Sequence, residues 1–569
     1  MAWSTQKFLL VSVIITSILA TLIISPSFAY DPINLPKMFV VVTGSSLMVV
    51  PLVRTLRNLI KTDFVFITCN MLFMTSLLFA FFSNSISKSQ QLWGVWGRST
   101  GLLTYLSFLI VMSVGFYLGS SLQYATIRSS FERLSYVVTL YTLLQAGQLD
   151  PINWSQKFMV ATLGNINFMS SFLGFATISF FSRIVIEKLA FPTKLFYLSF
   201  GFINLYLIWI SGSIQGLAVF AAGATLTVMF KVRMVWSYKN ALIWLASVMP
   251  VGISLFLGTI GLGPFSILRQ QTVIFRRDYW LAGISMTLDN WLNGVGIDSY
   301  GDYYEQYRDR AAVIRTGPER VANTAHNIFL DVSSGAGLIA GLLFSTLFIL
   351  SLLGINQIAR QGNFDSTFVG IASMFFGFVI FCLISINQIG VGIWGFLFMG
   401  YVRGAYMRLS KLQSEKKARF GKNSTPNSNL IAVDKKITPR ILAGMLTCGF
   451  VGMYLTLLPN VTDARFLKSI KTNNFNEMRE VVDTFSASTF HRDKYMTLLL
   501  DSRRERDAYE FAVEELKRNP RDQIALRIVA YSDFASKDKR RGALLELKSR
   551  DPNNYEFISY INELLKKLE

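Results

Sequence analysis

Long apolar stretches, separated by short charged segments, run along most of the chain. About 20 apolar residues are needed to cross roughly 30 Å of hydrocarbon as an α-helix, and a helix satisfies its own backbone hydrogen bonds in lipid. The pattern therefore predicts an all-α fold, a polytopic transmembrane helical bundle of about thirteen spans. The predicted spans begin near Phe8, Met38, Phe64, Gly101, Leu134, Phe158, Leu195, Ser213, Asn240, Ile328, Thr367, Val391 and Ile441.

The composition also indicates a membrane protein. Of the 569 residues, 52% are hydrophobic and only 16% are charged, more apolar material than a soluble chain of this length buries in its cores. A net charge of +20 would suit a nucleic-acid-binding protein, but the Lys and Arg residues occur in short segments between apolar stretches. We therefore expect contacts with membrane lipids and no nucleic-acid partner.

The basic segments predict the orientation. They are residues 54–61, 128–133, 183–194, 231–239 and 403–440, and all of them fall on one side of a bundle with this number of spans. Short connections rich in Lys and Arg stay in the cytoplasm. We thus expect a multi-pass protein of the bacterial inner membrane whose other connections and C-terminus are periplasmic.

The domain organisation follows from the same pattern. We expect a transmembrane domain at residues 1–458, which includes an outer loop at residues 261–327, and a periplasmic helical domain at residues 459–569. The loop is rich in aromatic residues, which favours order, and ordered loops of this length are usually functional. The first apolar segment is either a cleaved signal peptide or a retained anchor, and its length favours the anchor.

The C-terminal segment contains a faint repeat. Residues 514–520 resemble residues 544–552, and the two stretches contain Pro520 and Pro552. Their spacing is close to that of tetratricopeptide (TPR)-type helical hairpins, but an ordinary small helical domain explains the segment equally well. In either case it offers a surface for an envelope protein partner.

Cysteine and histidine contents limit the possible chemistry. Cys69, Cys382 and Cys448 lie inside predicted spans, so we expect neither a disulfide framework nor a metal-binding cysteine cluster. His326 and His491 are the two histidines of the chain, which excludes a His-rich metal site. We expect no cofactor and no metal, and we expect His491, which stands among charged residues, to be solvated.

Three short motifs follow one another in the outer loop. They are an arginine pair ahead of a tryptophan, a Gly-x-Gly turn, and a His-Asn pair ahead of the next predicted span. The residues are Arg276, Arg277, Trp280, Gly294, Gly296, His326 and Asn327. This ordered set resembles the O-antigen ligase/polymerase family of bacterial glycosyltransferases, which use lipid-diphosphate-linked sugars. Residues 94–101, 164–168 and 385–388 resemble other parts of that family.

The resemblance implies roles for individual residues. Arg276 would supply a cation for the donor diphosphate, with Arg277 as a neighbour or substitute, and His326 would engage the acceptor hydroxyl. Substrate binding would also involve Trp280, Gly294, Gly296 and Asn327. Many family members carry a further arginine near the outer end of a middle span, but residues 211–216 contain none. Arg98 is our candidate for the second cation that contacts the diphosphate.

The chemistry of such a transfer suits these residue types. A departing diphosphate needs fixed positive charge more than a general acid, and the planar arginine fork binds phosphate oxygens while staying protonated. The acceptor hydroxyl needs a group that titrates near neutrality, such as His326. Because the loop has no Asp-x-Asp pair, we expect metal-independent transfer, with inversion of the anomeric centre in a single displacement.

Several alternatives stay open at this level. Arg276 and Arg277 could instead reach towards lipid phosphates. The two glycines could form only a turn, and His326 could act only as a hydrogen-bonding residue at a helix end. The acceptor is a lipid A core sugar, a growing glycan or a protein hydroxyl. The competing function is a polysaccharide or lipid-linked sugar transporter or flippase, which would place ionisable groups near the bilayer midplane.

Overall fold

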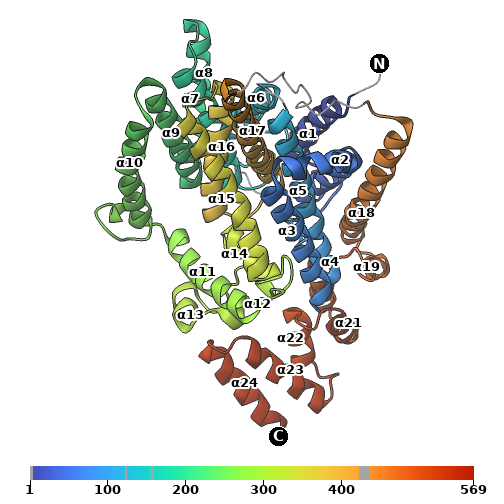
Figure 1. The fold of residues 1–569 in the computed structure, drawn as a ribbon. Helices are drawn as coiled ribbons and strands as arrows, with labels where there is room; N and C mark the ends of the chain where they lie inside the picture. Colours follow the sequence, from blue (N-terminus) through green and yellow to red (C-terminus); the bar gives the residue numbers. More distant parts are fainter. Residues whose placement is uncertain (1–3, 122–124, 153, 155–158, 422–435) are drawn as a thin grey trace.

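The computed structural model describes residues 4–121, 125–152, 154, 159–421 and 436–569. In this part of the chain every regular element is a helix, and no strand is formed. The predicted all-α class is therefore confirmed (Figure 1).

Among the residues that the structure describes, eleven helices are long and apolar enough to cross a membrane. They are α1 (Thr5–Leu22), α2 (Asn34–Thr62), α3 (Phe64–Ser83), α5 (Leu102–Ser121), α7 (Ile166–Ile186), α8 (Phe191–Ile210), α9 (Ile214–Val235), α10 (Tyr238–Thr259), α15 (Leu338–Gln361), α16 (Ser366–Ile384) and α18 (Pro439–Lys471). The two other predicted spans coincide with α6 (Ala125–Ala146) and α17 (Ile389–Gly421). Arg128, Glu132 and Arg133 in the first turns of α6 lower the hydropathy of that helix.

The centre of the bundle is a close contact between α5 and α17. A Cβ on Gly400 of α17 would lie 1.9 Å from the Met112 carbonyl oxygen, and one on Gly115 of α5 would lie 2.4 Å from the Leu397 carbonyl oxygen. Small residues allow helix backbones to approach in this way within membranes. Since α5 follows directly on residues 94–101, this contact gives that connection a rigid base.

The predicted outer loop is folded into helices at one end of the bundle (Figure 1). It contains a 3₁₀ turn (Ser266–Leu268), α11 (Gln271–Asp289), α12 (Tyr300–Tyr307) and α13 (Arg310–Thr316). α11 and α12 enclose a small apolar core that includes Tyr279, Met286, Tyr300 and Tyr304. The short helix α4 (Lys88–Trp93) lies in the connection between α3 and α5.

The span predicted to begin at Ile328 is two helices. α14 (Ile328–Ala336) ends at Gly337, where φ is +92°, and the span itself is α15. The break follows from a close approach, because Leu338 N–H donates to the Trp291 carbonyl at 2.7 Å. A Cβ on Gly337 would lie 2.6 Å from the Leu292 carbonyl oxygen. The start near Phe158 lies outside the described residues, and α7 begins at Ile166.

Several basic segments expected to be loops are instead parts of helices. Arg128 in α6 is fully buried, pairs with Glu132 at 3.0 Å and donates to the Ser179 carbonyl at 2.7 Å. Arg403 in α17 pairs with Asp63 at 2.6 Å. A buried guanidinium requires such partners, so these two residues join helices instead of contacting lipid. Residues 422–435 of the last basic segment lie outside the described part of the chain.

The C-terminal part is a set of short helices with a core of its own. α18 continues through Pro459 to Lys471, and α19 (Phe475–Val482), α20 (Thr489–Asp501), α21 (Glu505–Arg518), α22 (Gln523–Tyr531), α23 (Lys537–Arg550) and α24 (Tyr555–Leu568) follow it. Phe466 at the end of α18 is buried in this core. α21–α22 and α23–α24 are joined by similar capped turns, in which Asp522 accepts from Ala525 N–H and Asn554 from Phe557 N–H. The resemblance to tetratricopeptide arrays stays a prediction.

His491 is buried, contrary to the expectation that it is solvated. Its exposed fraction is 2%, and its Nε2 lies 2.9 Å from Asp463 Oδ1. The reason is that α18 brings a buried carboxylate against α20, a contact that the local sequence does not reveal. Asp463 also accepts hydrogen bonds from Trp96 Nε1 at 2.9 Å and from Asp31 N–H at 2.9 Å. We call this group of contacts the Asp463 junction.

Candidate active site

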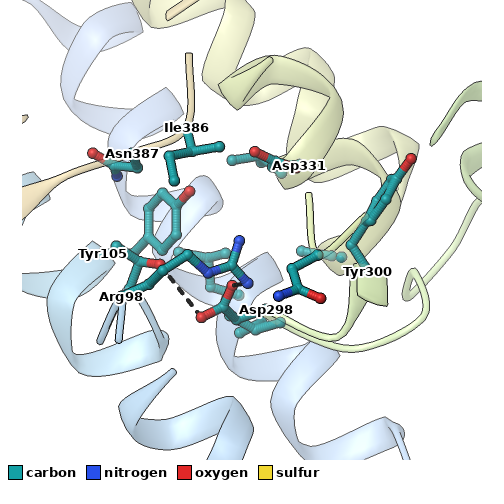
Figure 2. A pocket seen from close by; sticks show the side chains of 14 residues that line it. Arg98, Tyr105, Asp298, Tyr300, Asp331, Ile386 and Asn387 are labelled. Carbon is teal, nitrogen blue, oxygen red and sulfur yellow. Dashed lines mark hydrogen bonds and ion pairs between the residues drawn. The ribbon is translucent and has the colours of Figure 1, made fainter. Parts of the chain in front are cut away.

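Arg98 and Asp298 form an ion pair between two connections far apart in the sequence. Arg98 Nη2 lies 2.6 Å from Asp298 Oδ1, and both side chains are mostly buried. The other carboxylate oxygen of Asp298 accepts from Val95 N–H at 2.7 Å. The connection between α4 and α5 is thereby held against the loop that follows α11 (Figure 2).

The Gly-x-Gly turn makes this pairing possible. Gly294 and Gly296 have φ values of +66° and +112°, which glycine adopts readily. Val295 N–H donates to the Ser334 carbonyl at 2.8 Å, and a Cβ on Gly294 would lie 2.4 Å from the carbonyl carbon of Gly335. The two glycines therefore allow the turn to pack backbone to backbone on α14, two residues before Asp298.

A small cavity of about 30 Å³ lies beside the ion pair. Tyr105 and Asn387 line one side of it and Tyr300 another, with Asp331 above Arg98 in Figure 2. Asn387 is 6% exposed and interacts with the Tyr105 hydroxyl, but neither amide atom of its side chain forms a hydrogen bond of good geometry with a described residue. An unpaired buried amide is costly, so this side chain offers hydrogen bonds to a water or to a polar atom of a ligand.

His326, on whose pKa the cavity-lining Arg98 acts, has a strained backbone conformation. Its φ is +52°, which is uncommon for a residue other than glycine and typical of functional sites. The ring stacks on Tyr279 with centroids 5.7 Å apart, and neither ring nitrogen has a hydrogen-bond partner in the described part of the chain. Burial, together with the positive charges of Arg276 and Arg98, lowers the pKa of His326 to about 4. The imidazole is therefore neutral at physiological pH and able to accept a proton.

Two neighbouring side chains hold the turn that carries His326. The Asn327 side-chain oxygen accepts from Phe329 N–H at 3.0 Å and Leu330 N–H at 3.2 Å, and so caps α14. Asp331 Oδ1 accepts from Ala325 N–H at 2.8 Å. Burial raises the pKa of Asp331 to about 7.

Asp298, Asp331 and Tyr105 also belong to this site, although none of them is part of the motifs recognised in the sequence. A carboxylate in the first turn of a helix, behind an Asn cap, is the signal by which Asp331 could have been found. Asp298 follows the Gly-x-Gly turn directly, but its partner is remote in sequence. No comparable signal marks Tyr105, which lies in the apolar span α5.

α11 brings an arginine without an ionic partner to the same place. Arg276 is partly buried and Arg277 is exposed, and no described residue forms a hydrogen bond or ion pair with either guanidinium. Asp278, the next residue after this pair, forms its ion pair with Arg315 at 3.0 Å. Trp280, one turn after Arg276, has a buried indole N–H that lacks a hydrogen-bond partner among the described residues. Burial lowers the pKa of Arg276, but an arginine in such a site stays a cation.

The arrangement thus brings three predicted residues from separate segments together. The positive charges of Arg98 and Arg276 both act on the pKa of His326, whereas Arg277 is exposed to solvent. Arg98 is already paired with Asp298, and its Nε is buried without a partner. Among the residues that the structure describes, no group of three or more His, Cys, Asp or Glu side chains could hold a metal ion.

The fold and the site define a polytopic membrane protein with a cationic, histidine-containing site at one end of its helix bundle. A family model described as O-antigen ligase matches residues 198–345. This segment includes α11, the Gly-x-Gly turn, His326 and α14, and the match supports the resemblance of the chain to the O-antigen ligase family. The family indicates glycosyl transfer of the O-antigen ligase type, with a lipid-linked glycan as donor. No curated protein matches the chain in a sequence search.

Proposed function

We propose that this protein transfers a glycan from a polyprenyl diphosphate to an acceptor hydroxyl at the periplasmic face of the bacterial inner membrane. The observation that carries the proposal is the environment of His326, a neutral imidazole near two arginines, one of which has no ionic partner. A proton acceptor beside a site for an anion is the combination that this transfer requires.

The proposed reaction is one displacement at the anomeric carbon. The acceptor oxygen forms a bond to this carbon as the bond to the diphosphate oxygen breaks, and the configuration is inverted. His326 takes the acceptor proton, and the diphosphate leaves with the bonding electron pair. Arg276, and to a lesser extent the ion-paired Arg98, stabilise the charge that develops on the diphosphate.

Bound diphosphate would also alter His326. The positive charges of Arg276 and Arg98 contribute to the low pKa of the imidazole, and the negative charge of the diphosphate would offset them. Donor binding therefore raises the basicity of His326 at the moment when the acceptor proton has to be removed. Asp331 and Asn327 act as positioning residues, because they hold the turn that carries the imidazole.

The defining experiment is deletion of the gene and complementation with wild type, His326→Ala or Arg277→Ala, followed by analysis of surface glycans and lipid-linked sugars. Deletion should remove one surface glycan and lead to accumulation of its lipid-linked precursor. Wild type and Arg277→Ala should restore it, whereas His326→Ala should not. Full restoration by His326→Ala, at equal expression, would remove the catalytic role of this residue.

The same experiment distinguishes the possible acceptors. Accumulation of lipid-linked single repeats indicates a polymerase, accumulation of complete lipid-linked polymer indicates transfer to the lipid A core, and loss of glycan from a protein indicates a protein acceptor. We propose that the C-terminal helices contact the growing glycan or an envelope protein partner.

A further inference from the structure

A second cavity lies between the outer loop and the C-terminal helices. Its volume is about 220 Å³, larger than the 150 Å³ that accommodates a benzene molecule in an engineered protein cavity. α12 and residues 318–319 form one wall, and α22, α23 and the start of α24 form the other. We call it the C-terminal cavity.

A buried arginine holds the two walls together. Arg308 is fully buried and pairs with Asp551 at 2.7 Å, on the turn between α23 and α24. Its guanidinium also donates to the carbonyls of Pro318 at 3.0 Å and Arg320 at 3.1 Å. These contacts brace the two walls against each other, so that binding would cost little reorganisation.

The lining combines aromatic rings with unpaired polar groups. Tyr531, with 40% of its surface exposed, and Phe557 present ring surface to the cavity. The side chains of Glu319, Gln523 and Glu556 form no hydrogen bond or ion pair with any residue that the structure describes. Aromatic rings pack against the C–H groups of a sugar, and carboxylates and amides form hydrogen bonds with its hydroxyls. A lining that offers both kinds of group is therefore suited to a sugar ring.

The charges of the lining restrict the kind of sugar. Glu305, Glu319 and Glu556 face the cavity with Arg527, and the fourth carboxylate, Asp551, is already neutralised by Arg308. An anionic sugar would meet like charges there, whereas a neutral or amino sugar would not.

The cavity is connected to the candidate active site through two shared segments. Tyr300 and Glu305 stand on the same short helix, α12, and line the small cavity and the C-terminal cavity respectively. Five residues of α-helix span about 7.5 Å. Residues 318–319 line the C-terminal cavity, and Asn323, further along the same segment, lines the small cavity. A glycan that reacts beside His326 is thus able to extend towards the C-terminal helices.

We propose that the C-terminal cavity is a saccharide subsite for a neutral or amino-bearing sugar unit of the glycan, an inference that rests on the proposed glycosyl transfer. It gives the C-terminal helices a direct part in holding the polymer. The chain offers a matched pair of tyrosines for a test. Tyr531 lines the cavity, whereas Tyr560, also exposed and with its ring centroid 6.4 Å away, does not.

The test uses the full-length protein in detergent. The probe is the oligosaccharide released by mild acid from the lipid-linked glycan of the producing cells, and its binding is measured by saturation-transfer NMR titration. Tyr531→Ala should weaken binding about 3- to 10-fold, as expected from the loss of a stacked ring, and Tyr531→Phe should retain it within about twofold. Tyr560→Ala should bind as wild type does, and trigalacturonate should not compete for the cavity.

The proposal would be overturned if the oligosaccharide did not bind to wild type, or if Tyr531→Ala and Tyr560→Ala lost binding equally. Competition by trigalacturonate would overturn the preference for a neutral or amino sugar. A His326→Ala arm separates the two proposals. This variant should bind the oligosaccharide normally but fail to transfer glycan. Normal transfer by His326→Ala, with binding still sensitive to Tyr531→Ala, would contradict the catalytic mechanism and leave the subsite in place.

Discussion

His326 lies near two guanidinium groups, and this makes its protonation depend on what is bound nearby. In the protein without donor, the pKa of His326 is lowered to about 4 by burial and by the charges of Arg276 and Arg98. The neutral form therefore predominates above pH 4 and is lost as pH falls through this value. In the proposed reaction, a bound diphosphate would offset the arginines and move the pKa of His326 back towards the ordinary 6.5.

This coupling predicts different acid limbs for two kinetic parameters. kcat/KM for the donor, which reports the free enzyme, should fall only near pH 4, whereas kcat should fall at a higher pH. Arg276→Ala should raise the pKa of His326 in the unliganded protein, which NMR titration of labelled histidine measures, with His326→Gln to assign the signal. An unliganded wild-type His326 that titrates at 6.5 or above would contradict the electrostatic coupling.

Arg276 and Arg277 are adjacent, but their surroundings differ. Arg276 is partly buried near His326, and Arg277 is exposed to solvent. Arg276→Ala should weaken the binding of a lipid-diphosphate analogue and lower transfer about 10²- to 10³-fold, as for the loss of one transition-state donor. Arg276→Lys should restore activity only in part, because a point charge cannot reproduce the planar fork.

Arg277→Ala is the matched control in the same membranes and should change transfer by no more than about threefold, since the usual cost of losing an exposed charge is small. Equal losses in the two alanine variants would show that the cationic site is not specific to Arg276.

At the scale of elements, the C-terminal helices support the segment that carries Arg98. Asp463 of α18 accepts hydrogen bonds from Trp96 Nε1 and Asp31 N–H and lies against His491 of α20. Trp96 also stacks on Phe490, with ring centroids 3.8 Å apart. The Asp463 junction therefore connects α18 and α20 to residues only two positions from Arg98.

Asp463→Ala should destabilise the protein and disturb the site together. The change leaves several buried donors unpaired, each at a cost of about 1–3 kcal/mol, so the thermal unfolding temperature in detergent should fall and transfer should fall with it. Asp483→Ala removes an acceptor of two half-exposed ion pairs, with Arg479 and Arg518, and should have little effect on either measurement. A stable Asp463→Ala protein with normal transfer would show that the junction does not position the Arg98 segment.

For the whole molecule, the arrangement of helices predicts a C-terminus outside the cytoplasm. Thirteen helices at the positions of the predicted spans separate the N-terminus from the C-terminal helices, and the basic segments predict a cytoplasmic N-terminus. Alkaline phosphatase fused after Glu569 should be active, and a fluorescent protein fused there should be dark. The reverse result would place the site on the cytoplasmic side and remove the proposed reaction from the periplasm.

A second prediction for the whole molecule concerns divalent metals. If arginines stabilise the departing diphosphate, chelation by EDTA should leave transfer in proteoliposomes within about twofold, which is less than 0.5 kcal/mol of barrier. Complete loss that Mg²⁺ or Mn²⁺ restores would show that a metal ion takes the part assigned here to Arg276.

The sequence by itself determined the helical class, the approximate positions of the spans and the order of the motifs, because these depend on local hydropathy and on short spacings. It also singled out Arg276 and His326. It did not reveal the break at Gly337, because a backbone contact with residues 291–292 ends α14. Nor did it give the number of apolar helices, because a few charges decide whether a helix is apolar enough to cross a membrane.

Only the tertiary structure decided which of these residues meet and in what state. Asp298 partly neutralises Arg98 across a long stretch of sequence, burial and two remote cations lower the pKa of His326, and Asp463 buries His491. The C-terminal cavity likewise forms from elements that only packing brings together. Burial and electrostatic interactions depend on distances in space. Once helices pack, these distances cannot be deduced from separations along the chain.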